Sequence, residues 1–285
     1  IGTDALGGAV AGGEYNVAVG NYTLDALTSA DFVTAVGYQA GSAVTTGGYN
    51  TLIGHQAGLA MTSANTNTAI GHTALGSNTV GDRNTAVGSS ALSQFNPSSN
   101  TDNNNTAIGY AALNRLTTGV HNIAIGGTAM GGDPGPTTES HNLAMGVNSM
   151  GGNIAGGEYN IAIGNYTGQS LTSGDNNVLI GYLAGANTTS GGNATCVGFE
   201  AGKENTAHEL VAFGSKAAAS NTSGDGIVAI GRECYDAADT ENHNMAIGTG
   251  ALGGAVAGGE YNVAVGNYSL DALTSGDENV AVGYQ

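Results

Sequence analysis

A five-residue pattern, Asn-Thr-Ala-Ile-Gly, recurs along this chain at a nearly fixed spacing. It stands unaltered at residues 67–71 and with Val in place of Ile at residues 84–88. Its glycine, which we number position 0, ends sixteen copies of the pattern from Gly20 to Gly283. The mean period is about 17.5 residues, which indicates stacked structural repeats rather than a single globular core.

Each copy has the pattern of a short strand that ends at glycine. Position −1 is Val, Ile, Met or Phe in all sixteen copies, position −2 is Ala in thirteen, and position −4 is Asn in twelve. Side chains alternate along a strand, so positions −3 and −1 share one face and positions −4 and −2 share the other. Position +3 is small, as at Ala74, and turn-forming residues fill much of the remainder.

These columns predict an all-β chain that winds as a parallel β-roll, or β-solenoid, of about 17 residues and roughly 16 turns. No helical periodicity is present, and 50 glycines in 285 residues oppose helix formation. We expect residues 1–285 to form one continuous solenoid segment of a longer fibre. Residues 247–285 match residues 1–39 at 33 of 39 positions, which favours a fibre whose length is the selected property.

The alternation also leads to an expectation about the interior. We place the aliphatic −1 residues, the −3 residues and the Leu side chains at +4 inside, and the Ala column at −2 outside. Such an interior encloses little apolar volume to offset the chain entropy. We therefore expect copies of the chain to associate, most simply as three parallel chains, with the small −2 side chains letting a second backbone approach. The Asn column at −4 can hydrogen-bond along the stack.

The pattern Asn-Thr-Ala-Ile/Val-Gly-x-x-Ala-Leu resembles repeats of bacteriophage tail fibres that precede an endosialidase-type intramolecular chaperone. It is also similar to the shorter Val-Ala-Ile-Gly repeats of trimeric autotransporter adhesin heads, which form left-handed parallel β-rolls. The resemblance implies a left-handed homotrimeric fibre that serves as the shaft or stalk of an extracellular adhesin or phage tail fibre. It implies a location outside the cell, on a cell surface or on a virion tail.

Two insertions interrupt the regular period, near residues 93–104 and 131–141. They contain all three prolines, Pro97, Pro134 and Pro136, and insertions in solenoids bulge out as surface loops. An alternative function follows: the shaft itself binds a host-cell receptor or a glycan, through the loops around Pro97 and residues 133–138 or through columns of Tyr and His. An insertion without any partner is the other interpretation.

The charge of the chain disfavours two classes of partner. With 22 acidic and 5 basic residues, the net charge is −17. Nucleic acid binding relies on Lys and Arg, and anionic membranes repel a negative chain. No apolar run is long enough to span a bilayer. The charge would instead keep a long fibre soluble.

The residues do not predict an enzyme, and we assign no catalytic, cofactor-binding or metal site. His121, His141 and His243 share position −5 with several tyrosines, while His55 and His72 occupy position +1 in consecutive turns. Stacked histidines can bind metals, but Tyr replaces His freely, so we favour an exposed ring ladder. Acidic turns at residues 101–103, 174–177 and 276–279 leave Ca²⁺ as an alternative, although they lack EF-hand spacing.

Cysteine and threonine complete the set of unusual columns. Cys196 lies in the −2 column and Cys234 in the +3 column, so we expect both to be small buried residues without a disulfide. Threonine fills position −3 in five successive turns, at Thr34, Thr51, Thr68, Thr85 and Thr106. Such a column resembles an ice-binding surface, but it shares its face with the aliphatic −1 column, so we expect it to point inward.

Overall fold

The computed structural model describes residues 1–285 except 133–136, 153, 155, 238–239 and 255–256. The chain divides into two compact units, Ile1–Asn142 (unit 1) and Leu143–Gln285 (unit 2). The described residues form sixteen strands of three residues each and contain no helix. Over these residues, accordingly, no helix is long and apolar enough to cross a membrane.

Every strand occupies positions −3 to −1 of its repeat, as the sequence predicts. In unit 1 the strands are β1 (Val17–Val19), β2 (Thr34–Val36), β3 (Thr51–Ile53), β4 (Thr68–Ile70), β5 (Thr85–Val87), β6 (Thr106–Ile108) and β7 (Ile123–Ile125). In unit 2 they are β8 (Leu143–Met145), β9 (Ile161–Ile163), β10 (Val178–Ile180), β11 (Thr195–Val197), β12 (Val211–Phe213), β13 (Val228–Ile230), β14 (Met245–Ile247), β15 (Val263–Val265) and β16 (Val280–Val282).

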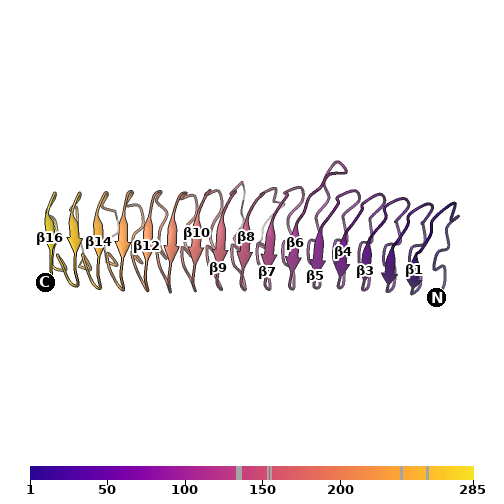
Figure 1. The fold of residues 1–285 in the computed structure, drawn as a ribbon, viewed down its shortest axis with the longest axis horizontal. Helices are drawn as coiled ribbons and strands as arrows, with labels where there is room; N and C mark the ends of the chain where they lie inside the picture. The colour runs from indigo at the N-terminus through magenta and orange to yellow at the C-terminus, as the bar shows by residue number, and fades with distance from the viewer. Residues whose placement is uncertain (133–136, 153, 155, 238–239, 255–256) are drawn as a thin grey trace. The chain divides into compact units, whose positions relative to one another are not determined.

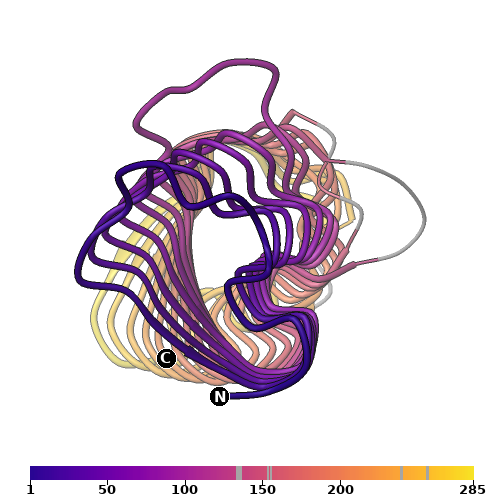
Figure 2. The same cartoon turned by 90° about the vertical axis from the view of Figure 1, so that its right-hand side faces the viewer.

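Neighbouring strands within each unit run parallel and in register (Figure 1), so identical repeat positions lie directly above one another. Thr51 pairs with Thr68 in unit 1, and Val178 pairs with Thr195 in unit 2. The turns of unit 1 follow a common outline, from which the segment between β5 and β6 projects (Figure 2). Each unit is thus a parallel β-solenoid, which confirms the expected fold class. The left-handed winding and the three-chain assembly stay predictions.

The structure corrects the expected interior. The −2 alanines, such as Ala35, Ala69 and Ala86, are fully buried, whereas the −3 and −1 side chains are half-buried or exposed. The leucines at +4, such as Leu24 and Leu75, are buried as expected. A turn of 17 residues is so narrow that only small side chains fit opposite the +4 column, since protein interiors are close-packed. The Ala column therefore faces inward and the larger aliphatic columns face outward.

The buried Asn column at −4 hydrogen-bonds along the stack, which confirms the expected ladder. Oδ1 of Asn50 accepts from the backbone N–H of Asn67 at 2.8 Å, and Oδ1 of Asn67 accepts from the backbone N–H of Asn84 at 2.8 Å. Nδ2 of Asn67 donates to the carbonyl of Gly81 at 3.0 Å. Each amide thus satisfies backbone groups that would otherwise be buried without partners.

In two turns the large and the small interior residue change places, so that Leu stands at −2 and Gly at +4. Leu52 occupies −2 in the turn whose +4 residue is Gly58, and Leu179 occupies −2 in the turn whose +4 residue is Gly185. A Cβ on either glycine would lie 2.8 Å from Cδ2 of Leu52 or 2.7 Å from Cδ2 of Leu179. The leucine therefore fills the same interior space from either side of the turn.

The motif glycine is required by both conformation and space. Gly54 has a φ of +134°, and a Cβ there would lie 2.5 Å from the carbonyl oxygen of Gly71 in the next turn. Gly164 in unit 2 has a φ of +136° and the corresponding distance to Gly181 is 2.6 Å. No L side chain fits this position, because the turns approach each other backbone to backbone.

Candidate interaction face

The exposed large apolar side chains gather on one surface of each unit. We call this surface the strand face and define it by the side chains at −3 and −1. In unit 1 it includes Val17, Val19 and Ile108, which are 48%, 39% and 39% exposed; in unit 2 it includes Phe213 at 55%. Scattered apolar residues are normal on a protein surface, but a contiguous apolar stripe marks an interaction site.

The strand face carries no charge. None of the sixteen repeats has Asp, Glu, Lys or Arg at −3 or −1, although the chain contains 27 charged residues. Neighbouring columns do accept charge: Arg83 lies at −5 and Glu200 at +2. The two outward columns of the strands are therefore an uncharged surface on an acidic chain.

The threonine column belongs to this face. Thr34, Thr51, Thr68, Thr85 and Thr106 pair in register through β2 to β6. All five are half-buried on the outer side of the strands. Our expectation that they point inward is wrong, because it depended on placing the −1 column inside.

Stacked rings flank the strand face on both sides, which is the ladder arrangement that the sequence favours. At −5, Phe32 lies 5.0 Å from both Tyr15 and Tyr49 between ring centroids. His121 stacks on His141 at 5.0 Å, and His243 stacks on Tyr261 at 5.1 Å. Because the rings cover one another's faces, these ladders present mainly ring edges to the solvent.

The ladder beyond the strand ends combines tyrosines and histidines. In unit 1, Tyr38 stacks on His55 at 5.3 Å and His55 stacks on His72 at 5.1 Å. In unit 2, Tyr182 stacks on Phe199 at 5.7 Å. All five rings are exposed.

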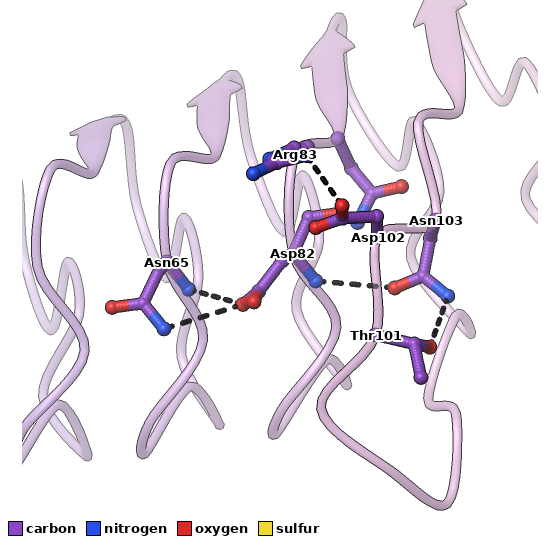
Figure 3. Close-up of polar contacts among 7 residues, drawn as sticks. Asn65, Asp82, Arg83, Thr101, Asp102 and Asn103 are labelled. Atoms are coloured by element: carbon purple, nitrogen blue, oxygen red, sulfur yellow. Dashed lines mark hydrogen bonds and ion pairs between the residues drawn. The ribbon is translucent and has the colours of Figure 1, made fainter.

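The first insertion is a loop that ion pairing and hydrogen bonds hold to the turn before it (Figure 3). Arg83 forms an ion pair with Asp102, and the backbone N–H of Asp82 donates to Oδ1 of Asn103 at 3.1 Å. Asp82 in turn accepts from the backbone N–H of Asn65 at 2.6 Å. Residues 98–102 are exposed and Pro97 is buried. In the second insertion, residues 133–136 lie outside the described residues.

The acidic turns use their carboxylates to accept backbone hydrogen bonds from the preceding turn. Oδ1 of Asp175 accepts from the N–H of Glu158 at 2.7 Å, and Oδ1 of Asp277 accepts from the N–H of Glu260 at 3.0 Å. Asp102 is paired with Arg83. These contacts give the acidic residues a structural role that does not involve Ca²⁺, which remains an untested alternative.

Both cysteines are free and fully buried. Burial raises the pKa of each thiol to about 12, so both stay protonated at neutral pH and are poor nucleophiles. A Cβ on Gly202 would lie 2.5 Å from Sγ of Cys196, so this sulfur fills the interior space beside a +4 glycine. The expectation of two small packing residues is confirmed.

Unit 2 contains an open hollow of about 260 Å³, lined by Glu233, Asp236, Tyr268, Asp271 and three glycines. Burial and the neighbouring Glu233 raise the pKa of Asp236. In the described part of the chain, no group of three or more His, Cys, Asp or Glu side chains is placed to hold a metal ion.

Comparison with known proteins gives no match to a family model, to a curated protein or to a solved structure.

Proposed function

We propose that this chain is the shaft of an extracellular fibre in which parallel copies associate through the strand face. The observation that carries the proposal is the position of the apolar side chains. The Val, Ile and Thr columns that a solenoid of ordinary width would bury are turned outward, where they form an uncharged stripe. Association of copies would bury this stripe and add the apolar contact that the narrow Ala interior lacks.

Charge supports the choice of this face over any other. Each chain carries a net charge of −17, so copies repel one another wherever their acidic turns meet. The strand face avoids that repulsion because it carries no charge. Three is the number of copies in the adhesin repeats that the Asn-Thr-Ala-Ile/Val-Gly pattern resembles, and a three-fold axis lets each strand face contact the other two equally.

The mechanism of such a shaft is mechanical. Each turn is tied to the next by strand hydrogen bonds, such as Thr68 N–H to the Asn84 carbonyl at 2.9 Å, and by the Asn ladder. A second outer ladder adds to this: the Thr45 hydroxyl donates to the Thr62 carbonyl at 3.0 Å, and the Thr62 hydroxyl donates to the Thr79 carbonyl at 3.1 Å. Repeated contacts of this kind resist bending and give a stiff spacer.

A charge placed on the strand face tests the proposal. Ile108→Glu would put a carboxylate into the proposed interface, and we expect the copies to separate while the chain keeps its strand signal in circular dichroism. Ser99→Glu, on the exposed loop tip, is the matched control and should leave the assembly intact. Assembly that survives Ile53→Glu and Ile108→Glu together would contradict the proposed face.

A second function is favoured by the loop between β5 and β6. The Arg83–Asp102 ion pair and the Asp82–Asn103 hydrogen bond hold its C-terminal end to the preceding turn, and its residues 98–102 are exposed. We infer that this loop, rather than the ring ladders with their covered faces, would contact a receptor if the shaft binds one. Replacing residues 98–101 by Gly-Ser should abolish binding of the purified shaft to host cells. Unchanged binding would mean that the shaft contacts the receptor through another surface, and no binding by the unaltered shaft would leave it as a spacer alone.

A further inference from the structure

We propose that His55 and His72 form a binding site for one divalent transition-metal ion, Zn²⁺, Cu²⁺ or Ni²⁺, that bridges two consecutive turns of unit 1. The two imidazole rings lie 5.1 Å apart between centroids and are tilted by 22°. Both side chains are exposed, so an ion can reach them from solvent. The sequence favours a plain ring ladder here, and the structure adds that the two exposed imidazoles of consecutive turns are close enough to share one ion.

The spacing suits a two-histidine chelate. Zinc binds imidazole nitrogen at about 2.0–2.1 Å, so two nitrogens on one tetrahedral ion lie roughly 3.4 Å apart. The stacked rings are 5.1 Å apart between centroids, so both exposed side chains would turn out of the stack for one nitrogen of each to converge on the ion. Thr73 Oγ1 lies 3.5 Å from Nδ1 of His72, which leaves Nε2 of this ring for the ion.

The backbone holds the two histidines at fixed spacing. The carbonyl of His55 accepts from the N–H of Thr73 at 3.0 Å, and the carbonyl of His72 accepts from the N–H of Ser90 at 2.8 Å. Only the side chains therefore need to move, and little conformational entropy is lost when an ion binds.

The surroundings select the class of ion. From Phe32 to Gly81 the sequence contains no Asp, Glu, Lys or Arg. Tyr38 stacks on His55 in the same ladder, and the hydroxyl of Thr73 lies beside His72. A site of neutral imidazoles without carboxylates suits zinc, copper or nickel, whereas Ca²⁺ and Mg²⁺ require oxygen ligands. Water would complete the coordination.

Titration with Zn²⁺ at pH 7.5, followed by calorimetry, tests the site on the whole chain. We expect His55→Asn/His72→Asn to lose one zinc per chain, and either single variant to weaken that zinc by at least about tenfold, because the chelate is broken. His208→Asn is the matched control: its Nδ1 already accepts from the N–H of Gly192 at 3.0 Å, and the substitution should leave the binding curve unchanged.

His121→Asn/His141→Asn serves as a second control, since that stacked pair lies in a different column. This variant should keep the zinc that the His55 and His72 variants lose. Hydrogen exchange gives an independent readout: zinc at 100 times its dissociation constant should slow exchange of amides in turns around Thr73 by up to about 100-fold. Equal zinc stoichiometry in the wild type and in His55→Asn/His72→Asn, or unchanged exchange around Thr73, would overturn the proposal.

Discussion

The two units share one backbone frame but differ in what their strand faces present. In unit 1, position −3 is Thr in five successive turns, from Thr34 to Thr106; in unit 2 it is aliphatic or Met in eight of nine turns, with Thr195 as the exception. Unit 1 has eight acidic and two basic residues, a net charge of −6, and unit 2 has fourteen and three, a net charge of −11. The more charged unit therefore carries the more apolar face.

The comparison separates the requirements of the turn from those of the surface. Both units have glycine at position 0, and turns in both units bury one large and one small side chain at positions −2 and +4. The close packing inside the turn imposes these residues. Position −3 points outward, so either Thr or an aliphatic side chain satisfies the β-strand. If copies associate through this face, unit 2 gains more from burial and also has more repulsion to overcome.

The largest effect is expected from substituting the motif glycine, which tests whether both units have the same backbone conformation at position 0. Gly54→Ala and Gly164→Ala each place a Cβ against a backbone carbonyl of the next turn at a φ above +130°. We expect each to lower the free energy of unfolding by more than about 3 kcal/mol, because neither the backbone nor the φ can adjust. Urea unfolding measures this effect.

Gly127→Ala is the control for both glycine variants, because a Cβ there meets nothing within 4 Å. It should change stability by less than about 0.5 kcal/mol. If Gly54→Ala left stability unchanged while Gly164→Ala lowered it, the two units would not share the same backbone conformation at the motif glycine.

The second test moves the interior leucine from position −2 to position +4 of the same turn. Leu52→Ala in unit 1 and Leu179→Ala in unit 2 should each cost about 2–5 kcal/mol through the cavity they leave. Adding Gly58→Leu or Gly185→Leu should recover most of that loss, since turns such as that of Ala69 and Leu75 already have this arrangement. Thermal melts of the four variants check it, and a double variant less stable than its single parent would contradict the exchange.

The third test uses the interior column at −4, where Asn is replaced in the consecutive turns of Ala194, Leu210 and Ile227 in unit 2. Asn67→Leu should cost about 1–3 kcal/mol, since the N–H of Asn84 loses its acceptor. In unit 2, Leu210 stands at −4, and beside it the buried amides of Asn205 and Asn221 are hydrogen-bonded to each other at 2.9 Å. Leu210→Asn should therefore also be destabilising when measured by urea unfolding, whereas a neutral result would show that the two amide columns are interchangeable.

The smallest expected effect lies on the strand face. Thr68→Val in unit 1 should strengthen association of copies by roughly 0.5–1 kcal/mol per chain, and Val178→Thr in unit 2 should weaken it by a similar amount. Sedimentation equilibrium over a dilution series measures both changes. No change for either variant would indicate that −3 is not in the interface.

Periodicity was sufficient to predict the strands, the period and the Asn ladder. The column of each residue, together with small size, also predicted the packing of Cys196 and Cys234. Alternation alone could not decide which face turns inward, because it divides the side chains into two sets without ranking them. A wide core would take the larger aliphatic set inside, whereas this narrow turn admits Ala at −2 opposite a leucine at +4, or a larger −2 side chain opposite a +4 glycine.

One signal in the sequence could have identified the inward face. Leu appears at −2 only where the +4 residue of the same turn is Gly, as at Leu52 with Gly58 and Leu179 with Gly185. Such exchange of volume requires the two positions to share one interior. The left-handed backbone at Tyr49 (φ 59°) and Gln56 (φ 58°) had no sequence signal, because neither is a glycine. Tertiary contacts of the stack impose it.

The mass of the chain in solution, measured by light scattering after size exclusion, tests the central claim most directly. One chain has a mass of 27.9 kDa, and the account predicts a particle of three times that mass which falls to the single-chain value in Ile108→Glu. A wild-type particle of one chain mass, with its strand face open to solvent, would contradict the proposed assembly.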